Sequence, residues 1–506
     1  MPKVKGSLEL PLRARSAGQS LTDWLYDELR SAILEGRLPP RTRLPATRDF
    51  AVLHGLSRGT VVQVFERLHS EGYLCTQVGA GTCVNGRVAL RPPPPPELAA
   101  PPDYIRRTIA TYKRPKAFAG LKSLGPPRPF RIGGVDFQEF PSKLWSGLVA
   151  RRARNAGPWP LNDYDPRGYK PLREAIAHYL GSSRGIGCAT DQVILVSGVQ
   201  QALDLLARLL LKPRAKVWME DPGYFGARIA FESVAAKIIP VPVDSEGIRV
   251  SIGRKTAASA AGAYVTPAHQ FPLGMAMSLG RRMELLKWAA NAGAFIIEDD
   301  YDSEFRFEGR PIPTLMSLDQ SSSVILVGSF SKMLFPSLRI GYILASPALA
   351  DFVVAFRART DFRAIHFEQA VLADFMERGH LGRHLRRMRE IYSSRYAALL
   401  EAARKYVAGE LEVRNVHCGL YTAAYLKNGM SSSEAEKAAS AAGVETLSLD
   451  RCTLAAPDPK GLLLGFASFN EAAIREGMRK LARALSDRQG RNIKPPREAR
   501  TVKANC

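Results

Sequence analysis

A lysine flanked by small hydroxyl residues and followed by an arginine stands at the centre of residues 327–342. Lys332 follows an apolar run, residues 324–326, which predicts a buried strand. A lysine at the carboxyl end of such a strand is partly desolvated, which lowers its pKa and makes the neutral amine available as a nucleophile. Ser329, Ser331 and Arg339 offer hydroxyl and guanidinium groups that suit a phosphate. An amine that can react with an aldehyde, beside groups that can bind a phosphate, predicts a site for pyridoxal 5'-phosphate. The alternative is that Lys332 is an ordinary surface lysine.

Other places along the chain carry residues that suit the same ligand, each directly after a predicted strand. A turn into a helix N-terminus exposes amides for a phosphate, and an aromatic ring can cover a flat ligand. A buried acid can pair with a protonated pyridine nitrogen. The residues at these places are Gly198, Val199, Gln200, Tyr224, His269, Asp299 and Tyr301. Taken singly, each could be a loop glycine, a packed tyrosine, a core histidine or a solvated acid, but their order with Lys332 favours one shared site.

Alternating helices and short β-rich runs must position these residues. The predicted strands are residues 193–197, 216–219, 236–240, 263–266, 295–298, 323–327 and 340–345. Strands alternating with helices predict an α/β fold with a largely parallel sheet. Ligands of such sheets gather at the carboxyl ends of the strands, which is where the residues named above fall.

The first 90 residues have a different pattern, with three predicted helices and a hairpin. In residues 21–34 the apolar side chains fall on one face of a predicted first helix. A second short helix is predicted at residues 48–53, and a third follows Ser57, which is placed to cap it. Residues 73–84 form two β-rich runs about a Gly-Ala-Gly turn, which predicts a β-hairpin, or wing. Two short helices joined by a turn predict a helix-turn-helix DNA-binding domain.

Charge supports a polyanionic partner for this region. Six arginines but only two acidic residues lie between positions 36 and 68, and Arg48 and Arg58 fall where phosphates and base edges would be met. The whole chain has a formal net charge of +23, which is unusual for a metabolic enzyme. For Arg37, Arg41 and Arg67 a solvated surface charge is the alternative.

Length and composition limit the remaining possibilities. A chain of 506 residues predicts two or three domains. We expect a DNA-binding domain at residues 18–86, a Pro-rich basic linker at 87–129, an α/β domain at 130–486 and a basic, disordered tail at 487–506. The sequence has neither a membrane-spanning apolar run nor a signal-peptide core, so we expect a cytoplasmic protein. The six cysteines lack CxxC or metal-finger spacing, which predicts free thiols and no metal site.

The first 90 residues resemble the GntR-type winged helix-turn-helix. The matching stretches are residues 34–40, 43–48, 56–61 and 71–74. This resemblance implies a set of residues that face DNA, the last of them in the wing: Arg48, Ser57, Arg58, Thr60 and Gly79. Gly59 departs from the pattern, because the family more often has a polar side chain there.

Residues 164–339 resemble the fold-type I pyridoxal-phosphate aminotransferases of class I/II, with weaker similarity to about residue 485. The resemblance implies that Lys332 forms the internal Schiff base and that Asp299, rather than Asp300, pairs with the pyridine nitrogen. Tyr301 would bond the ring hydroxyl and Tyr224 would stack on the ring. The phosphate would be held by the Gly198–Gln200 turn, Ser329 and Arg339.

Three departures from the aminotransferase pattern affect these expectations. Residues 271–274 replace the usual Asn-Pro-Thr-Gly, so the asparagine that steadies the ring oxygen is missing and His269 or Gln270 would substitute. The strand at 461–467 has leucine where aminotransferases usually place the arginine that grips the substrate carboxylate. Tyr164 lies one residue away from the position of the tyrosine that usually reaches the phosphate of the partner subunit.

Together, the two halves and their Pro-rich linker look like a bacterial MocR-type (GabR-like) transcription regulator. The resemblance implies a homodimer that binds double-stranded operator DNA and pyridoxal 5'-phosphate, and that senses an amine or amino-acid effector by external aldimine formation. The missing arginine argues for a sensor rather than an enzyme. One alternative is an active aminotransferase with an appended DNA-binding domain; another is a GntR-type repressor whose large domain only dimerises. Arg228 and His269 are candidates for effector specificity.

Overall fold

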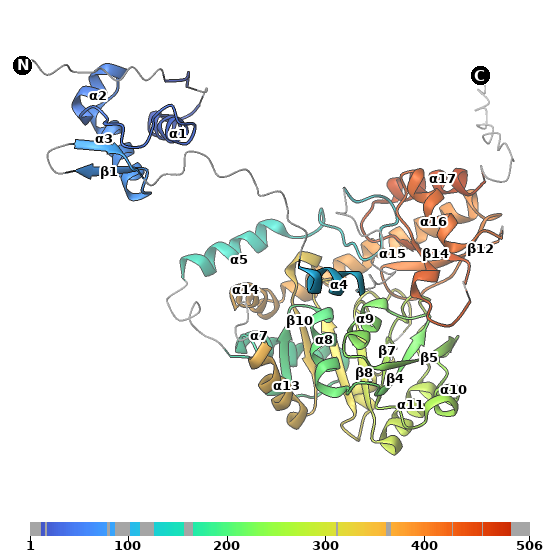
Figure 1. Ribbon diagram of the computed structural model, residues 1–506. Helices are drawn as coiled ribbons and strands as arrows, with labels where there is room; N and C mark the ends of the chain where they lie inside the picture. Colours follow the sequence, from blue (N-terminus) through green and yellow to red (C-terminus); the bar gives the residue numbers. More distant parts are fainter. Residues whose placement is uncertain are drawn as a thin grey trace, which may run out of the picture. The chain divides into compact units, whose positions relative to one another are not determined.

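The computed structural model describes residues 12–15, 18–77, 81–86, 102–111, 126–155, 165–309, 312–360, 366–427, 429–457 and 459–486. The chain divides into two compact units, Met1–Lys113 and Arg114–Cys506 (Figure 1). Gly79 and Tyr164 lie outside the described residues. No helix in the described ranges is both long and apolar enough to cross a membrane. The same ranges contain no cluster of three or more His, Cys, Asp or Glu side chains that could hold a metal ion.

The first unit contains the three predicted helices and the predicted hairpin. Ser57 caps the third helix, because its hydroxyl accepts a hydrogen bond from the Thr60 amide at 3.1 Å. Gly55 ends the second helix in the left-handed conformation (φ 63°), which glycine adopts without strain. The bounds are α1 (Leu21–Leu34), α2 (Thr47–His54), α3 (Arg58–Ser70), β1 (Leu74–Gln77) and β2 (Gly81–Val84).

One apolar face of each element meets in a small core. The hairpin closes this core, and β2 also bonds on its other edge to the loop before α2, where the Leu44 amide donates to the Thr82 carbonyl at 2.9 Å. Burial of these faces supplies the driving force that holds three short helices together. The core residues include Leu25, Leu29, Ile33, Phe50, Val61, Phe65, Leu68, Leu74 and Val84.

A short helix that the sequence pattern did not predict, α4 (Asp103–Thr111), lies within the expected linker. Two prolines precede it, and Asp103 in its first turn forms an ion pair with Arg106. Residues 103–111 of the predicted linker therefore form a helix in the structure.

An eight-stranded sheet forms the centre of the second unit, in the order β3-β10-β9-β8-β7-β4-β5-β6. Strands β4, β5, β7, β8 and β9 run parallel, whereas β10 is antiparallel to both neighbours and β6 is antiparallel to β5. The predicted α/β fold with a largely parallel sheet is therefore confirmed. The bounds are β3 (Val193–Val196), β4 (Lys216–Asp221), β5 (Lys237–Asp244), β6 (Gly247–Ile248), β7 (Gly262–Val265), β8 (Phe295–Asp300), β9 (Val324–Ser329) and β10 (Gly341–Leu344).

Helices cover both faces of this sheet. Because successive residues of a strand point to opposite faces, Ile297 packs with α8, α9 and α13, whereas its neighbour Ile296 packs with α10 and α11. The helices of this unit before residue 380 are α5 (Ser142–Arg154), α7 (Lys170–Arg184), η2 (Thr190–Gln192), α8 (Val199–Leu210), α9 (Phe225–Ser233), α10 (Val250–Ala257), α11 (Leu279–Ala292), α12 (Leu315–Leu318), η3 (Pro336–Leu338), α13 (Pro347–Thr360) and α14 (His366–Glu377).

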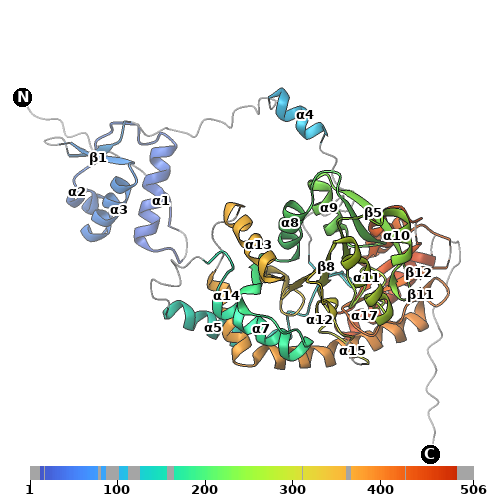
Figure 2. The same ribbon diagram turned by 90° about the horizontal axis from the view of Figure 1, so that it is seen from below.

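A second, four-stranded antiparallel sheet has the order β11-β12-β14-β13. The long helix α15 runs from the α7 end of the unit to this sheet (Figure 2) and packs against α17. The bounds are α15 (His380–Tyr406), β11 (Leu411–Val413), β12 (Tyr421–Leu426), α16 (Ser432–Ala441), β13 (Leu447–Ser448), η4 (Leu449–Cys452), β14 (Gly461–Gly465) and α17 (Glu471–Ser486).

Candidate functional site

A cavity of about 750 Å³ lies at the carboxyl ends of the parallel strands and is closed by residues of the small sheet. This is the edge at which α/β sheets gather their ligands. The structure brings most of the predicted cofactor residues to this cavity. Those that line it are Gly198, Val199, Gln200, Tyr224, Asp299, Tyr301, Ser329, Ser331, Lys332 and Arg339.

Lys332 follows β9 and is half-buried in the cavity wall. Its amine donates a hydrogen bond to the Gly133 carbonyl at 2.8 Å. Burial lowers the pKa of Lys332, although the negative charge of Asp302 opposes the shift. Gly133 has φ 79°, a conformation that favours glycine, and a Cβ atom there would lie 2.7 Å from the lysine nitrogen, which would have to move. The structure therefore shows an amine that deprotonates more readily than an exposed lysine.

Asp299 presents a carboxylate oxygen that lacks a partner. Its Oδ2 accepts a hydrogen bond from the Tyr264 hydroxyl at 2.7 Å, whereas its buried Oδ1 has no hydrogen-bond partner within the described ranges. Burial raises the pKa of Asp299 to about 7, the Tyr264 hydrogen bond opposes the shift, and Asp300 and Asp302 add to it. An unpaired buried carboxylate on a cavity wall suits a ligand that donates a proton or carries a positive charge.

The choice of Asp299 over Asp300 agrees with the strand geometry. Successive side chains of β8 point to opposite faces, so Asp300 turns away from Asp299. The Asp300 carboxylate lies 3.3 Å from the Arg184 guanidinium, and Asp300 does not line the cavity.

One end of the cavity offers groups that suit a phosphate. Gly198 precedes α8 with φ 94°, a conformation that favours glycine, and leaves the first amides of the helix directed at the cavity end. The Ser329 hydroxyl accepts from the Ser331 amide at 3.1 Å. Arg339 donates to the Ser197 carbonyl at 3.0 Å, which holds its guanidinium at the same turn.

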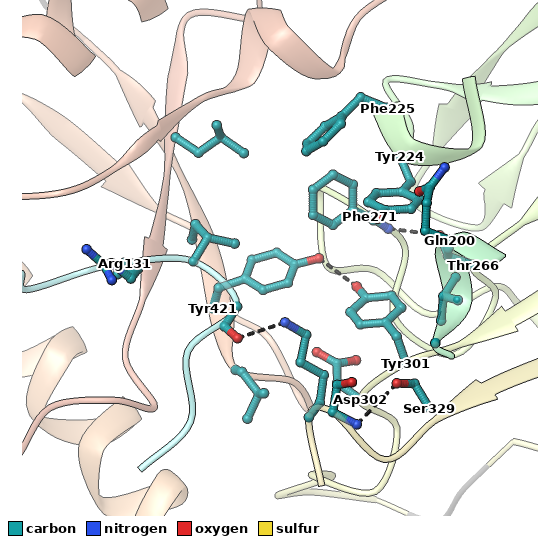
Figure 3. A pocket seen from close by; sticks show the side chains of 18 of the residues that line it. Arg131, Gln200, Tyr224, Phe225, Thr266, Phe271, Tyr301, Asp302, Ser329 and Tyr421 are labelled. Atoms are coloured by element: carbon teal, nitrogen blue, oxygen red, sulfur yellow. Dashed lines mark hydrogen bonds between the residues drawn. The ribbon is translucent and has the colours of Figure 1, made fainter. Parts of the chain in front are cut away.

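Aromatic side chains form another wall (Figure 3). The Tyr224 ring packs edge-on against Phe271, with ring centroids 5.5 Å apart, and Phe225 lies beside both. Burial raises the pKa of Tyr224 to about 12. This wall is apolar and aromatic, which suits the ring of a planar ligand.

Tyr301 belongs to a hydrogen-bonded group that the sequence did not predict. Its hydroxyl lies 2.6 Å from the hydroxyl of Tyr421, the first residue of β12 (Figure 3). It also donates to the His269 carbonyl at 2.8 Å. Tyr421 lines the cavity, but no short-range pattern marks it, because it reaches the site from a different sheet.

The prediction that His269 contacts the cofactor needs a correction. Of the predicted cofactor-binding residues that the structure describes, His269 is the one that does not line the cavity. Its Nδ1 lies 3.0 Å from both carboxylate oxygens of Asp302 and 3.2 Å from the Tyr301 hydroxyl. His269 therefore holds the Tyr301 hydroxyl in position from outside the cavity. The Gln270 side-chain amide is engaged elsewhere: it donates to the Phe271 carbonyl in its own loop and to the Pro222 carbonyl after β4.

Two arginines reach the cavity from places that the sequence did not indicate. Arg131 is bound to Glu445 at 2.7 Å, and Arg451 of η4 is bound to Glu436 at 3.0 Å. The site thus has guanidinium groups, although β14 carries leucines. Arg228 does not line the cavity and instead pairs with Glu232 one turn along α9 at 2.8 Å.

In the first unit the predicted DNA-facing residues that the structure describes gather at two helix starts. Arg48 lies in the first turn of α2 and Arg58 begins α3; both are exposed, and neither has an acidic partner in the described part of the chain. Ser57 and Thr60 form the cap of α3, with their hydroxyl oxygens 2.8 Å apart. The positions of these side chains are compatible with the predicted contacts and do not test them.

Two other arginines of this unit, Arg37 and Arg67, make contacts within the domain. Arg37 bonds the half-exposed Glu35 and the buried Glu28, both at 2.9 Å. Arg67 bonds Glu71 at 3.2 Å and its guanidinium lies 3.7 Å from the centre of the Tyr26 ring. These arginines are structural rather than merely solvated.

Comparison with known sequences gives two family matches in chain order. Residues 21–84 match the bacterial regulatory proteins of the gntR family, and residues 156–442 match aminotransferase class I and II. The probable rhizopine catabolism regulatory protein MocR of Rhizobium meliloti is 36% identical over 503 residues, which covers 97% of this chain and 99% of that protein. The pyridoxine biosynthesis transcriptional regulator PdxR of Corynebacterium glutamicum is 27% identical and covers 92% and 96%, respectively.

Comparison with solved structures confirms the predicted fold of the second unit. The kynurenine aminotransferase of Pyrococcus horikoshii, solved with PMP, is 26% identical with a TM-score of 0.70, covering 76% of this chain and 98% of that one. The α-aminoadipate aminotransferase LysN of Thermus thermophilus, complexed with N-(5'-phosphopyridoxyl)-L-leucine, is 27% identical with a TM-score of 0.66, covering 71% and 92%. The chain belongs to the MocR-type transcriptional regulators, which join a gntR-family helix-turn-helix domain to an aminotransferase-like domain of the pyridoxal-phosphate-dependent fold.

Proposed function

We propose that this chain is a DNA-binding transcription regulator that holds pyridoxal 5'-phosphate through Lys332 and responds to an amine or amino-acid effector in the same cavity. The main support is that an amine of lowered pKa and the unpaired Asp299 oxygen line one cavity. Exposed arginines on a helix-turn-helix supply the DNA-binding half.

Each group of the cavity has a separate role in this proposal. The cofactor, when bound, supplies an aldehyde that exchanges one amine for another. Lys332 provides the resident amine, and Asp299 keeps a proton on the ring nitrogen. With the cofactor bound, the Tyr301 hydroxyl would donate to the ring oxygen instead of the His269 carbonyl, and Tyr421 and His269 would position it. The phosphate is held by the amides of residues 198–200, Ser329, Ser331 and Arg339, and the ring is covered by Tyr224.

The effector would act through linkage between its site and the DNA-binding unit. Arg131 and Arg451 can attract a carboxylate of the effector, because both guanidinium groups line the cavity. An effector shifts the DNA-bound population only by its difference in affinity for the two states of the protein. We further propose that the protein is a homodimer whose two DNA-binding domains engage repeated half-sites, with Arg48, Ser57, Arg58, Thr60 and Gly79 facing DNA.

The attachment site can be tested by trapping the cofactor. Protein purified with pyridoxal 5'-phosphate would be reduced with borohydride and digested, and we expect the mass of the reduced cofactor on the peptide that contains Lys332. Lys332→Ala should abolish the visible absorption band and the labelled peptide. Lys287→Ala, an exposed lysine on α11, is the matched control and should keep both. Labelling of another lysine at equal stoichiometry in the wild type would contradict the proposal.

An active aminotransferase with a DNA-binding appendage is a second candidate. One observation favours it: Arg131 and Arg451 line the cavity although the usual arginine is missing from β14. Incubation of the purified protein with candidate amino donors and pyruvate distinguishes the two. Keto-acid formation over many turnovers would establish the enzyme, whereas at most one equivalent per subunit is expected of a sensor.

A further inference from the structure

Two cysteines face each other across the wing of the DNA-binding domain. Cys75 of β1 lies directly opposite Cys83 of β2; both are free thiols, and their sulfur atoms are 3.1 Å apart. On the far edge of β2 the Val84 amide donates to the Thr42 carbonyl, so the amide of Cys83 points toward β1. Hydrogen-bonded antiparallel pairs have Cα atoms about 5.5 Å apart, within the range of about 4.4–6.8 Å that a disulfide spans.

The fold of the hairpin keeps the two sulfur atoms together on its outer face. Leu74 and Val84, the neighbours of the cysteines, are buried in the core of the domain, so the alternation of strand side chains turns the cysteines the other way. Asn85 fixes the base of the hairpin, because its backbone amide donates to the Tyr73 carbonyl at 2.8 Å. Cys75 is half-buried and Cys83 is 9% exposed, so a small oxidant reaches Cys75 first.

We propose that Cys75 and Cys83 are a modification site at which a peroxide forms a reversible disulfide in the wing. The Cys75 thiolate attacks one oxygen of hydrogen peroxide, the O–O bond breaks, and a sulfenic acid and water result. The Cys83 sulfur then attacks the sulfenic sulfur, which forms the S–S bond and releases a second water. Two thiols lose two electrons and two protons, and the peroxide is reduced to water. A dithiol reductant reverses the reaction.

The order of the two cysteines follows from their surroundings. The hydrogen bond with Cys75 raises the pKa of the Cys83 thiol, and burial adds to the shift. Cys83 is therefore harder to ionise than an exposed thiol, and Cys75, which is the more exposed of the two, makes the first attack. The disulfide would cross-link the two strands of the wing, which the proposed function places beside DNA, and it does not depend on the cavity or the cofactor.

Mass spectrometry of the full-length protein tests this site, because trypsin leaves both cysteines in one peptide, residues 68–87. After treatment with hydrogen peroxide and alkylation, we expect this peptide to be lighter by two hydrogen atoms and to carry no alkyl group. Dithiothreitol should restore two alkylated thiols. Hydrogen exchange at the amides of the same peptide should be slower in the oxidised protein.

Three variants define the outcome. Neither Cys75→Ser nor Cys83→Ser should lose two hydrogen atoms from this peptide. Cys75→Ser should alkylate at Cys83, whereas Cys83→Ser should carry added oxygen on Cys75 because no second thiol resolves the sulfenic acid. Cys188→Ser, which changes a cysteine outside the wing, should oxidise like the wild type. Full alkylation of both wing thiols in the oxidised wild-type protein would overturn the proposal. So would peptides 68–87 joined between two molecules, or a single over-oxidised cysteine.

Discussion

The two units expose their charged groups to ligands in opposite ways. In the DNA-binding unit Arg48 and Arg58 are exposed and have no acidic partner in the part of the unit that is described. At the cavity Arg131 and Arg451 are each bound to a glutamate, at 2.7 and 3.0 Å. An exposed arginine meets a polyanion without breaking a contact, and its interaction is screened by salt. An arginine held by a carboxylate is oriented beforehand, so a ligand must compete with that carboxylate.

Burial also distinguishes the titrating groups of the cavity from the exposed charges of the DNA-binding unit. Asp299 and Lys332 sit where burial shifts their pKa values toward neutrality. The cavity should therefore respond to pH, and the DNA-binding surface should respond mainly to ionic strength.

Asp299→Ala should weaken cofactor binding most. Removing one partner of a buried ion pair costs about 3–5 kcal/mol, which corresponds to at least about a 100-fold loss of affinity. Titration of the cofactor-free variant with pyridoxal 5'-phosphate, followed by absorbance, measures the loss. Asp300→Asn is the adjacent control and should bind normally, since Asp300 pairs with Arg184 outside the cavity. Equal losses in both variants would remove the special role of Asp299.

Asp299→Asn should stabilise the cofactor-free protein more at pH 8 than at pH 5. The carboxyl has a pKa of about 7 when folded and about 3.9 when unfolded. Between these values the folded protein binds more protons than the unfolded one, so stability falls as pH rises through this window. The advantage of the variant should grow by at most about 3 kcal/mol between pH 5 and pH 8. Thermal unfolding at the two pH values measures it; a constant difference would mean that Asp299 is ionised throughout.

Arg58→Ala should weaken operator binding by about 1–3 kcal/mol if the side chain reads a base. An operator duplex selected from a random-sequence pool, titrated at fixed salt, would measure the effect. Arg67→Ala is the control within the same helix, because Arg67 is bound to Glu71 and covers Tyr26. It should leave DNA affinity unchanged and lower thermal stability slightly. Unchanged affinity in Arg58→Ala would refute its role.

Tyr421→Phe should have the smallest effect, about 1 kcal/mol, because it removes one hydrogen bond to Tyr301. The expected result is a shift of the pH at which the visible band of the bound cofactor titrates, with the cofactor still attached. Leu420→Ala, which removes a neighbouring lining residue without a hydroxyl, should leave that pH unchanged. Identical titrations in the wild type and Tyr421→Phe would show that the tyrosine pair does not tune the site.

The elements that the sequence predicted well are those with local signals. The cap at Ser57 and the apolar spacing of residues 21–34 each depend on atoms within a few residues, so they are present in the structure where the pattern places them. The strands of the large sheet follow the same rule, because buried parallel strands are continuous apolar runs. Residues at the carboxyl ends of those strands, including Lys332 and Asp299, then had to meet at one edge of the sheet.

Local sequence patterns did not predict the contacts between distant segments. Arg131, Tyr421 and Arg451 enter the cavity from a loop and from the small sheet, and His269 turned out to support Tyr301 rather than to line the cavity. The sequence alone determined the two domain types and the order of the strand-end residues, because hydrophobic periodicity and caps act over a few residues. Only the tertiary structure decided which arginines, tyrosines and cysteines face one another, because packing between sheets and the register of a hairpin depend on the whole fold.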